Sequence, residues 1–166
     1  MIDTIFEYVS TIAGLEITAF GREREVYAIA FRNSTVVRKN IAERFDILEG
    51  NSCDEIPSIL ENYSSTSSLA NLRPVFLWGT EFQMAVWNQL QKIKWGETIT
   101  YRQLAESIGR PNSARAVGQA VGANPIPIVV PCHRIVGARG VGGYSGGIEI
   151  KRKLLALEGA TFFKKK

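Results

Sequence analysis

TEFQMAVWNQLQKI at residues 80–93 and TYRQLAESIGRPNSARAVGQAVG at residues 100–122 decide the fold of the second half of this chain. Each stretch opens with a Thr followed three residues later by a Gln, which is the capping-box pattern that begins an α-helix. In the first stretch, apolar residues then recur at helical spacing from Phe82 to Ile93. The sequence therefore predicts one helix from residue 80 and another from residue 100.

The second stretch predicts two helices joined by a tight turn. Residues 109–112, Gly-Arg-Pro-Asn, interrupt the apolar periodicity, and a further helix is expected over residues 113–122. This arrangement is typical of a helix-turn-helix, although many helical pairs of this kind bind nothing. A last helix is expected over residues 148–158, with Gly159 at its C-terminal end.

The helix over residues 113–122 has two different faces. Ala114, Val117 and Val121 lie on one side and are expected to pack inward. The opposite side carries few side chains, and its residues are Arg115, Gly118, Gln119 and Gly122. A glycine inside a helix costs about 1 kcal/mol relative to alanine, so this face predicts the close approach of a partner such as a DNA minor groove. Close packing against another helix is the alternative interpretation.

The first half of the chain predicts a small α/β domain. Leu15–Phe20 and Glu25–Phe31 are short apolar and β-branched runs separated by a turn at residues 21–24, as in a β-hairpin. Residues 36–48 are expected to be helical, and Ser-rich residues 64–72 are expected to form a linker.

The predicted fold therefore has two domains. An α/β domain, with the linker at its end, is expected over residues 1–74. A mostly helical domain that contains the helix-turn-helix is expected over residues 75–166. The 166 residues are enough for two small cores.

The charge is distributed unevenly between these halves. Residues 1–74 carry a net charge of −4, whereas residues 75–166 carry +8. Three of the later charges belong to the terminal Lys164–Lys166, which could act only as a solubilising end, but +5 remains without them. This surplus favours a polyanionic partner such as a nucleic acid.

The composition excludes several classes of protein. The apolar runs are far too short to span a membrane, and the acidic N-terminus lacks the pattern of a signal peptide. Two cysteines and one histidine indicate neither a disulfide framework nor a Cys/His zinc site. We expect an intracellular protein, cytoplasmic or, in a eukaryote, nuclear, that binds no metal; a metal site made only of carboxylates stays open.

Cys132 is the candidate nucleophile. It lies within NPIPIVVPCHRIVG at residues 124–137, where Ile128–Val130 has the composition of a buried strand and Pro131 ends it. His133 and Arg134 follow directly, and either a base or a positive charge would increase the thiolate fraction of a thiol whose ordinary pKa is about 8.5. An inert buried cysteine is the alternative, and Cys53, in a polar stretch without a base nearby, fits that alternative.

These motifs closely resemble the O6-alkylguanine-DNA alkyltransferases, also called methylated-DNA–protein-cysteine methyltransferases. The likeness covers residues 80–160. The matching motifs stand in family order: GET and TY within residues 96–101, ARAVG at 114–118, NP at 124–125, PCHR at 131–134, GGYSGG at 142–147, and LL and EG within 154–159.

The resemblance implies a single-turnover methyltransferase in which Cys132 accepts the alkyl group irreversibly from O6-alkylguanine in DNA, with O4-alkylthymine as a further candidate substrate. It also implies that no cofactor is needed, because the damaged DNA is the alkyl donor. His133 would remove the thiol proton through a water, and Glu158 would orient the imidazole. Asn124 would hold the turns around the thiol, and Tyr101 would donate a hydrogen bond to the leaving purine. Read without the resemblance, Glu158 could be a solvated charge and Tyr101 a core aromatic.

The resemblance also implies that the damaged nucleotide is rotated out of double-stranded DNA. Arg115 would occupy the vacated space, and Tyr101 would crowd the target phosphate. Arg102, Arg110, Ala114 and Gly118 would also contact DNA. The pocket for the rotated base would be formed by Tyr144, Ser145, Pro127 and Ile135.

The resulting prediction is a monomeric DNA-repair protein that acts on double-stranded DNA and has no membrane partner. Three alternatives stay open: a protein that binds alkylated bases without transfer, a helix-turn-helix regulator, and a cysteine hydrolase. The range of alkyl groups, the activity on thymine and the role of the first half are not determined by the sequence.

Overall fold

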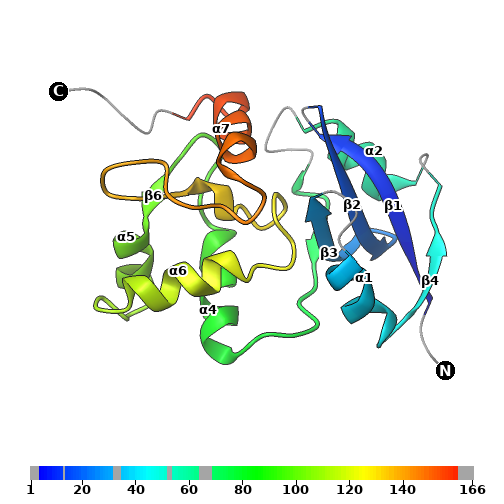
Figure 1. Cartoon of the computed structure of the whole chain (residues 1–166), viewed down its shortest axis with the longest axis horizontal. Helices are drawn as coiled ribbons and strands as arrows, with labels where there is room; N and C mark the ends of the chain where they lie inside the picture. The colour runs from blue at the N-terminus through cyan, green and yellow to red at the C-terminus, as the bar shows by residue number, and fades with distance from the viewer. Residues whose placement is uncertain (1–3, 13, 32–34, 52–53, 64–68, 161–166) are drawn as a thin grey trace. The chain divides into compact units, whose positions relative to one another are not determined.

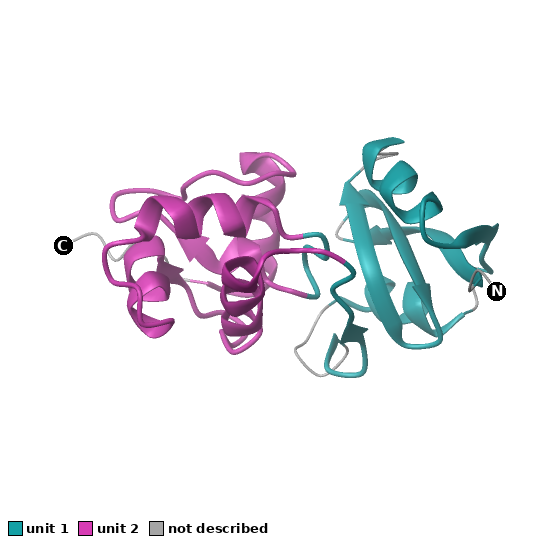
Figure 2. Ribbon diagram, turned by 90° about the horizontal axis from the view of Figure 1, so that it is seen from below, with its two compact units in different colours: residues 1–77, 125–129 teal, residues 78–124, 130–166 magenta. Residues whose placement is uncertain are grey.

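A computed structural model describes residues 4–12, 14–31, 35–51, 54–63 and 69–160 (Figure 1). The chain divides into two compact units (Figure 2). Unit 1 contains residues 1–77 and 125–129, and unit 2 contains residues 78–124 and 130–166. Residues 64–68 of the expected linker, as well as Cys53 and the terminal lysines, lie outside the described residues.

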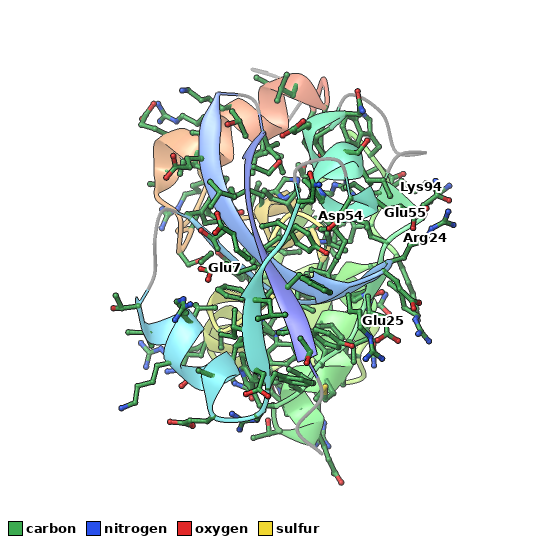
Figure 3. All side chains as sticks on the ribbon, turned by 90° about the vertical axis from the view of Figure 1, so that its right-hand side faces the viewer. Glu7, Arg24, Glu25, Asp54, Glu55 and Lys94 are labelled. Atoms are coloured by element: carbon green, nitrogen blue, oxygen red, sulfur yellow. The ribbon has the colours of Figure 1, made fainter. Side chains whose placement is uncertain are left out.

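Unit 1 is built on a five-stranded sheet in the order β4-β1-β2-β3-β5. The predicted hairpin is confirmed, since β2 and β3 pair in antiparallel fashion. The strands are β1 (Thr4–Ile12), β2 (Leu15–Arg22), β3 (Glu25–Phe31), β4 (Asp46–Glu49) and β5 (Arg73–Pro74). The β2–β3 turn is bound to the start of helix α2 (Glu55–Glu61), where Arg24 Nε and Nη2 each donate to a Glu55 carboxylate oxygen, at 2.8 and 2.7 Å (Figure 3).

The predicted helix over residues 36–48 is wrong in its second part. Helix α1 (Thr35–Ala42) ends early, and residues 46–49 form β4 instead. This strand pairs in parallel with β1, so that Ile47 lies opposite Ile5. A four-residue stretch such as Asp-Ile-Leu-Glu has no decisive local preference, and pairing with a strand 42 residues earlier overrides its helical propensity.

Unit 2 is mostly helical, as predicted. Its helices are α4 (Glu81–Leu90), α5 (Tyr101–Ser107), α6 (Ala114–Gly122) and α7 (Ile148–Leu157). Both capping boxes are present, with Thr80 accepting from the Gln83 amide and Thr100 accepting from the Gln103 amide, each at 3.2 Å. Strands β6 (Ile99–Thr100) and β7 (Ile135–Val136) pair in parallel, and η1 (Cys132–Arg134) is a single 3₁₀ turn.

The core of unit 2 fixes the orientation of α6. Trp87 is fully buried on α4, and its Nε1 donates a 2.8 Å hydrogen bond to the carbonyl of Ala120 on α6. Val117 and Val121 are also buried, whereas Arg115 and Gln119 are exposed. The division of this helix into an apolar and a nearly bare face is therefore confirmed.

The predicted strand at Ile128–Val130 is wrong. Residues 125–129 form turns that belong to unit 1, where the Ile29 amide of β3 donates to the Pro125 carbonyl at 2.9 Å. Ile128 has a φ of +76°, which an extended strand does not permit. The apolar character of this run reflects burial, and burial alone does not distinguish a strand from a packed turn.

No helix within the described ranges is long and apolar enough to cross a membrane.

Candidate active site

The backbone before Cys132 is held by Asn124. The Asn124 side-chain amide donates a 2.8 Å hydrogen bond to the carbonyl of Val130, and the Cys132 amide donates to the same carbonyl at 2.8 Å. Asn124 itself is buried. The residue predicted to support the nucleophile therefore closes the turn that places Cys132 at the start of η1.

The Cys132 thiol is free and only 2% exposed. Burial raises its pKa, while side-chain hydrogen bonds with Asn124 and Tyr144 and the positive charge of Lys151 act in the opposite direction. Burial has the largest effect, so the thiol stays protonated at neutral pH. A nucleophilic role for this cysteine consequently requires a base.

His133 is the candidate for that base. It is fully buried, and its Nε2 lies 2.6 Å from Oε1 of Glu158. Burial lowers the pKa of His133 against the opposing influence of Glu158, so the imidazole is neutral. Because an ionised Glu158 only accepts hydrogen bonds, Nε2 carries the ring proton and Nδ1 carries the basic lone pair.

Glu158 is the centre of a buried network rather than a solvated charge. Its side chain has no exposed surface, and it accepts from Arg134 Nε at 2.8 Å and Nη2 at 3.0 Å. The Gly96 amide also donates to it, at 3.3 Å. Arg134 completes its bonding with Nη1, which donates to the Ile93 carbonyl at 2.6 Å. Arg134, one of two possible activators of the thiol in the sequence, is therefore hydrogen-bonded to Glu158.

Unit 2 contains a pocket of about 320 Å³, within the size range of small-ligand sites. Tyr144 connects this pocket with Cys132, because it lines the pocket and its side chain is hydrogen-bonded to the Cys132 thiol. The Tyr144 ring also meets the His133 ring edge-on, with 6.5 Å between the ring centroids. Tyr101, half-buried, lines the pocket as well, and burial raises its pKa, with a smaller contribution from the charge of Cys132. The full lining is Tyr101, Gly118, Val121, Gly122, Gly143, Tyr144 and Ser145.

The residues expected in the base pocket are divided between the two units. Ile135 is fully buried in β7, paired with Ile99, and is not part of the lining. Pro127 belongs to unit 1. Tyr144 and Ser145 line the pocket.

The residues expected to contact DNA lie on α5, α6 and the turn between them. Arg110 and Arg115 are exposed, and Ala114 is half-buried. Arg102 is 82% exposed on its side chain, where its Nε pairs with Glu106 at 3.0 Å. Arg110 and Arg115 are therefore exposed cations, whereas the charge of Arg102 is paired with Glu106.

The two glycines of α6 are not required by packing inside unit 2. A Cβ placed on Gly122 would meet no atom within 4 Å, and one placed on Gly118 would lie 3.7 Å from the ring of Tyr101, an ordinary contact. Neither residue has a positive φ. Close helix packing, the alternative explanation for the bare face, therefore does not account for these glycines.

Lys151 is a site residue that sequence reasoning missed. It is fully buried on α7, where Nζ donates to the carbonyls of Ile135 at 2.5 Å and Gly143 at 3.0 Å. Burial lowers its pKa to about 8, while Cys132 acts in the opposite direction. A signal was available, since Lys151 precedes Leu154, Leu155 and Glu158 at helical spacing and therefore shares their inward face.

Unit 1 carries a larger hollow, of about 550 Å³, whose lining includes the Glu7–Arg38 ion pair. This lining holds neither a cysteine nor a histidine, so it offers no counterpart to the Cys132 site. Among the residues that the structure describes, no group of three or more His, Cys, Asp or Glu side chains could hold a metal ion.

Comparisons with known proteins agree with this geometry. A family model described as "6-O-methylguanine DNA methyltransferase, DNA binding domain" matches residues 81–160. The methylated-DNA–protein-cysteine methyltransferase of Saccharolobus islandicus is 41% identical over 119 residues, which cover 69% of this chain and 78% of that protein. The protein of the same name from Metallosphaera sedula is 51% identical over 87 residues, which cover 52% of this chain and 54% of that protein.

The match thus spans about half the length of the Metallosphaera relative. Similarity of structure extends further. The crystal structure of Mycobacterium tuberculosis OGT in complex with DNA has a TM-score of 0.75 and 33% identity, and the match covers 94% of this chain and 92% of that one.

Proposed function

This chain belongs to the 6-O-methylguanine DNA methyltransferase family, and we propose that it repairs DNA by transferring an alkyl group from O6 of guanine to Sγ of Cys132. The observation that carries the proposal is a buried thiol whose hydrogen-bond partner, Tyr144, both lines the 320 Å³ pocket and meets the neutral ring of His133 edge-on. The relatives' names and the DNA in the M. tuberculosis OGT structure support the same reaction.

The reaction is an in-line displacement. His133 Nδ1 takes the thiol proton through a water, and the sulfur of Cys132 then attacks the alkyl carbon. The S–C bond forms as the C–O6 bond breaks, and the electron pair of that bond leaves with the purine. Tyr101 donates a hydrogen bond to the departing ring and so spreads its negative charge.

The buried network keeps His133 suited to this step. Glu158 accepts the Nε2 proton and stabilises the imidazolium that forms when Nδ1 is protonated. Arg134 keeps Glu158 ionised by binding both of its oxygens. The base is therefore neutral at rest and stabilised once charged.

The guanine must leave the duplex to reach the pocket. Helix α6 lies in the minor groove, with its glycine face against the backbone of the DNA and Arg115 in the space left by the rotated base. Two glycines that the fold does not need support this placement, because a bare helix face allows the closest approach to a groove. Arg102 and Arg110 contact phosphates, in keeping with the net charge of +8 on residues 75–166.

The product is a thioether, which neither hydrolysis nor protonation reverses, so each chain acts once. The damaged DNA supplies the alkyl group, and no cofactor takes part in the step. O4-alkylthymine is a second substrate of the same chemistry. Such a protein works where the DNA is, in the cytoplasm or in the nucleus of a eukaryote.

The test is the intact mass of the protein after incubation with a duplex containing O6-methylguanine. We expect a gain of one methylene's mass on the peptide containing Cys132, with no more than one group per chain. Cys53→Ser should still gain this mass, whereas Cys132→Ser should not. Binding without any gain of mass would refute transfer, and turnover beyond one per chain would indicate hydrolysis.

A further inference from the structure

Lys151 presents a problem of charge that the proposed reaction does not explain. Its side chain has no exposed surface, and an ammonium removed from water is strongly destabilised unless it is paired. Buried lysines normally have a carboxylate partner. In the part of the chain that the structure describes, no Asp or Glu pairs with Lys151.

The ammonium is held instead by two backbone carbonyls, which lie at opposite ends of one loop. Ile135 stands in β7 before the loop, and Gly143 stands after it. Between them the Gly137 amide donates to the Gly140 carbonyl at 2.8 Å, which closes a tight hairpin. Lys151 therefore clamps the base of the loop directly before Tyr144.

The clamped loop leads straight into the pocket. Gly143, Tyr144 and Ser145 all line it, and Tyr144 bonds to the thiol. A Cβ on Gly142 would come within 3.3 Å of the Tyr101 ring and hydroxyl, so the same loop also packs on the tyrosine across the pocket. Movement of the Gly143 carbonyl would therefore displace the two tyrosines that line the pocket, Tyr144 in the loop and Tyr101 packed against it.

The charge of Lys151 also acts on Cys132. Lysine and thiol favour each other's ionised forms, as the opposite signs of their charges require. Two other titratable groups lie in this region. Lys151 helps to keep His133 neutral, and Arg134 already binds Glu158 through both carboxylate oxygens. The Lys151 ammonium therefore has no anionic partner among the described residues. The thiolate of Cys132, which the reaction must create, would supply that partner.

We propose that Lys151 is a positioning residue of the transfer reaction: the thiolate of Cys132 is its counter-ion, and its ammonium holds the Gly143 end of the pocket loop. This inference rests on the proposed function for the reaction that it serves. The ion pair itself concerns only side chains of this protein, so it can be measured without DNA.

The first experiment compares Lys151→Met, which keeps the aliphatic length and removes the charge, with Lys151→Arg, which keeps a charge. Lys153→Met is the matched control, since Lys153 is an exposed residue of the same helix. The readout is the rate at which neutral iodoacetamide alkylates Cys132 between pH 6 and 11, with peptide mapping to separate Cys132 from Cys53.

We expect Lys151→Met to move the midpoint of this profile upward by about one pH unit, which lowers the rate at any pH below the midpoint about tenfold. Lys151→Arg should recover part of the loss, and Lys153→Met should match the wild type. A folded Lys151→Met protein with the wild-type profile would overturn the proposal, because a purely structural lysine would leave the midpoint in place.

A second measurement covers the case in which the Lys151 variants do not fold. The ¹³Cε resonance of Lys151 is titrated in the wild type and in Cys132→Ser, which leaves the lysine intact. Loss of the thiolate should lower the titration midpoint of Lys151, and equal midpoints would contradict the ion pair. If the wild type shows these shifts but gains no methyl group from alkylated DNA, the proposed function fails while the ion pair stands.

Discussion

Gly118→Ala should make this protein more stable and a poorer ligand for DNA at the same time. Gly118 lies in the interior of α6, where replacing glycine by alanine stabilises a helix by about 1 kcal/mol. The added Cβ would lie 3.7 Å from Tyr101, so it meets no steric opposition inside the unit. For a chain of this length the gain corresponds to a rise in Tm of about 2–4 °C.

The effect on DNA has the opposite sign. If the groove lies against the bare face of α6, a methyl group inserted into that contact acts as overpacking, which costs about 1–3 kcal/mol. Affinity for a duplex should therefore fall about fivefold to more than a hundredfold. The DNA must already accommodate the exposed side chain of Gln119, the next residue of α6. The test at Gly118 therefore concerns only the added methyl group.

The assay combines thermal unfolding with fluorescence anisotropy on a labelled duplex at fixed salt. Ala156→Gly, at an exposed position of α7, is the matched control and should lower stability by about 1 kcal/mol without changing affinity. A Gly118→Ala protein that is stabilised and binds DNA as tightly as the wild type would refute the placement of α6 in the groove. A destabilised one would refute the packing argument.

Four further predictions concern the buried network and Arg115, the residue proposed to intercalate. Glu158→Gln leaves the guanidinium of Arg134 buried without its counter-ion and should lower the free energy of unfolding in urea by about 3–5 kcal/mol, whereas Glu149→Gln, 83% exposed on its side chain, should change it little. Burial lowers the pKa of His133, so the imidazole stays neutral when the pH falls below its ordinary pKa of about 6.5. The rate of single-turnover transfer should therefore stay constant as the pH falls through 6.5 and should decline only at lower pH. A decline in rate centred at or above pH 6.5 would contradict a lowered pKa. The same depression means that His133 withholds a proton that the unfolded chain would bind, so its contribution to stability is complete above pH 6.5 and is lost as the pH falls toward the lowered pKa. Arg115→Ala should slow transfer from duplex DNA at least tenfold and leave attack on the free alkylated base unchanged; equal losses on both substrates would argue against intercalation.

Local signals account for the parts of the fold that the sequence predicts well. The capping boxes at Thr80 and Thr100 join groups three residues apart, so the sequence contains both partners side by side. The two faces of α6 follow from its own periodicity in the same way. Strand β4 has no such local signal, because its pairing partner is β1, and the prediction of a helix failed there.

The same distinction between local signals and contacts of distant segments applies to the site around Cys132. The sequence by itself identified Cys132 as the candidate nucleophile, the adjacent histidine and the bare face of α6, because each is a property of neighbouring residues. Only the tertiary structure decided that Arg134 binds Glu158 rather than activating the thiol, and that Lys151 is buried near Cys132 without a carboxylate partner in the described residues. Burial and electrostatics depend on which distant segments share a low-dielectric interior, and that is settled when α7 packs against η1.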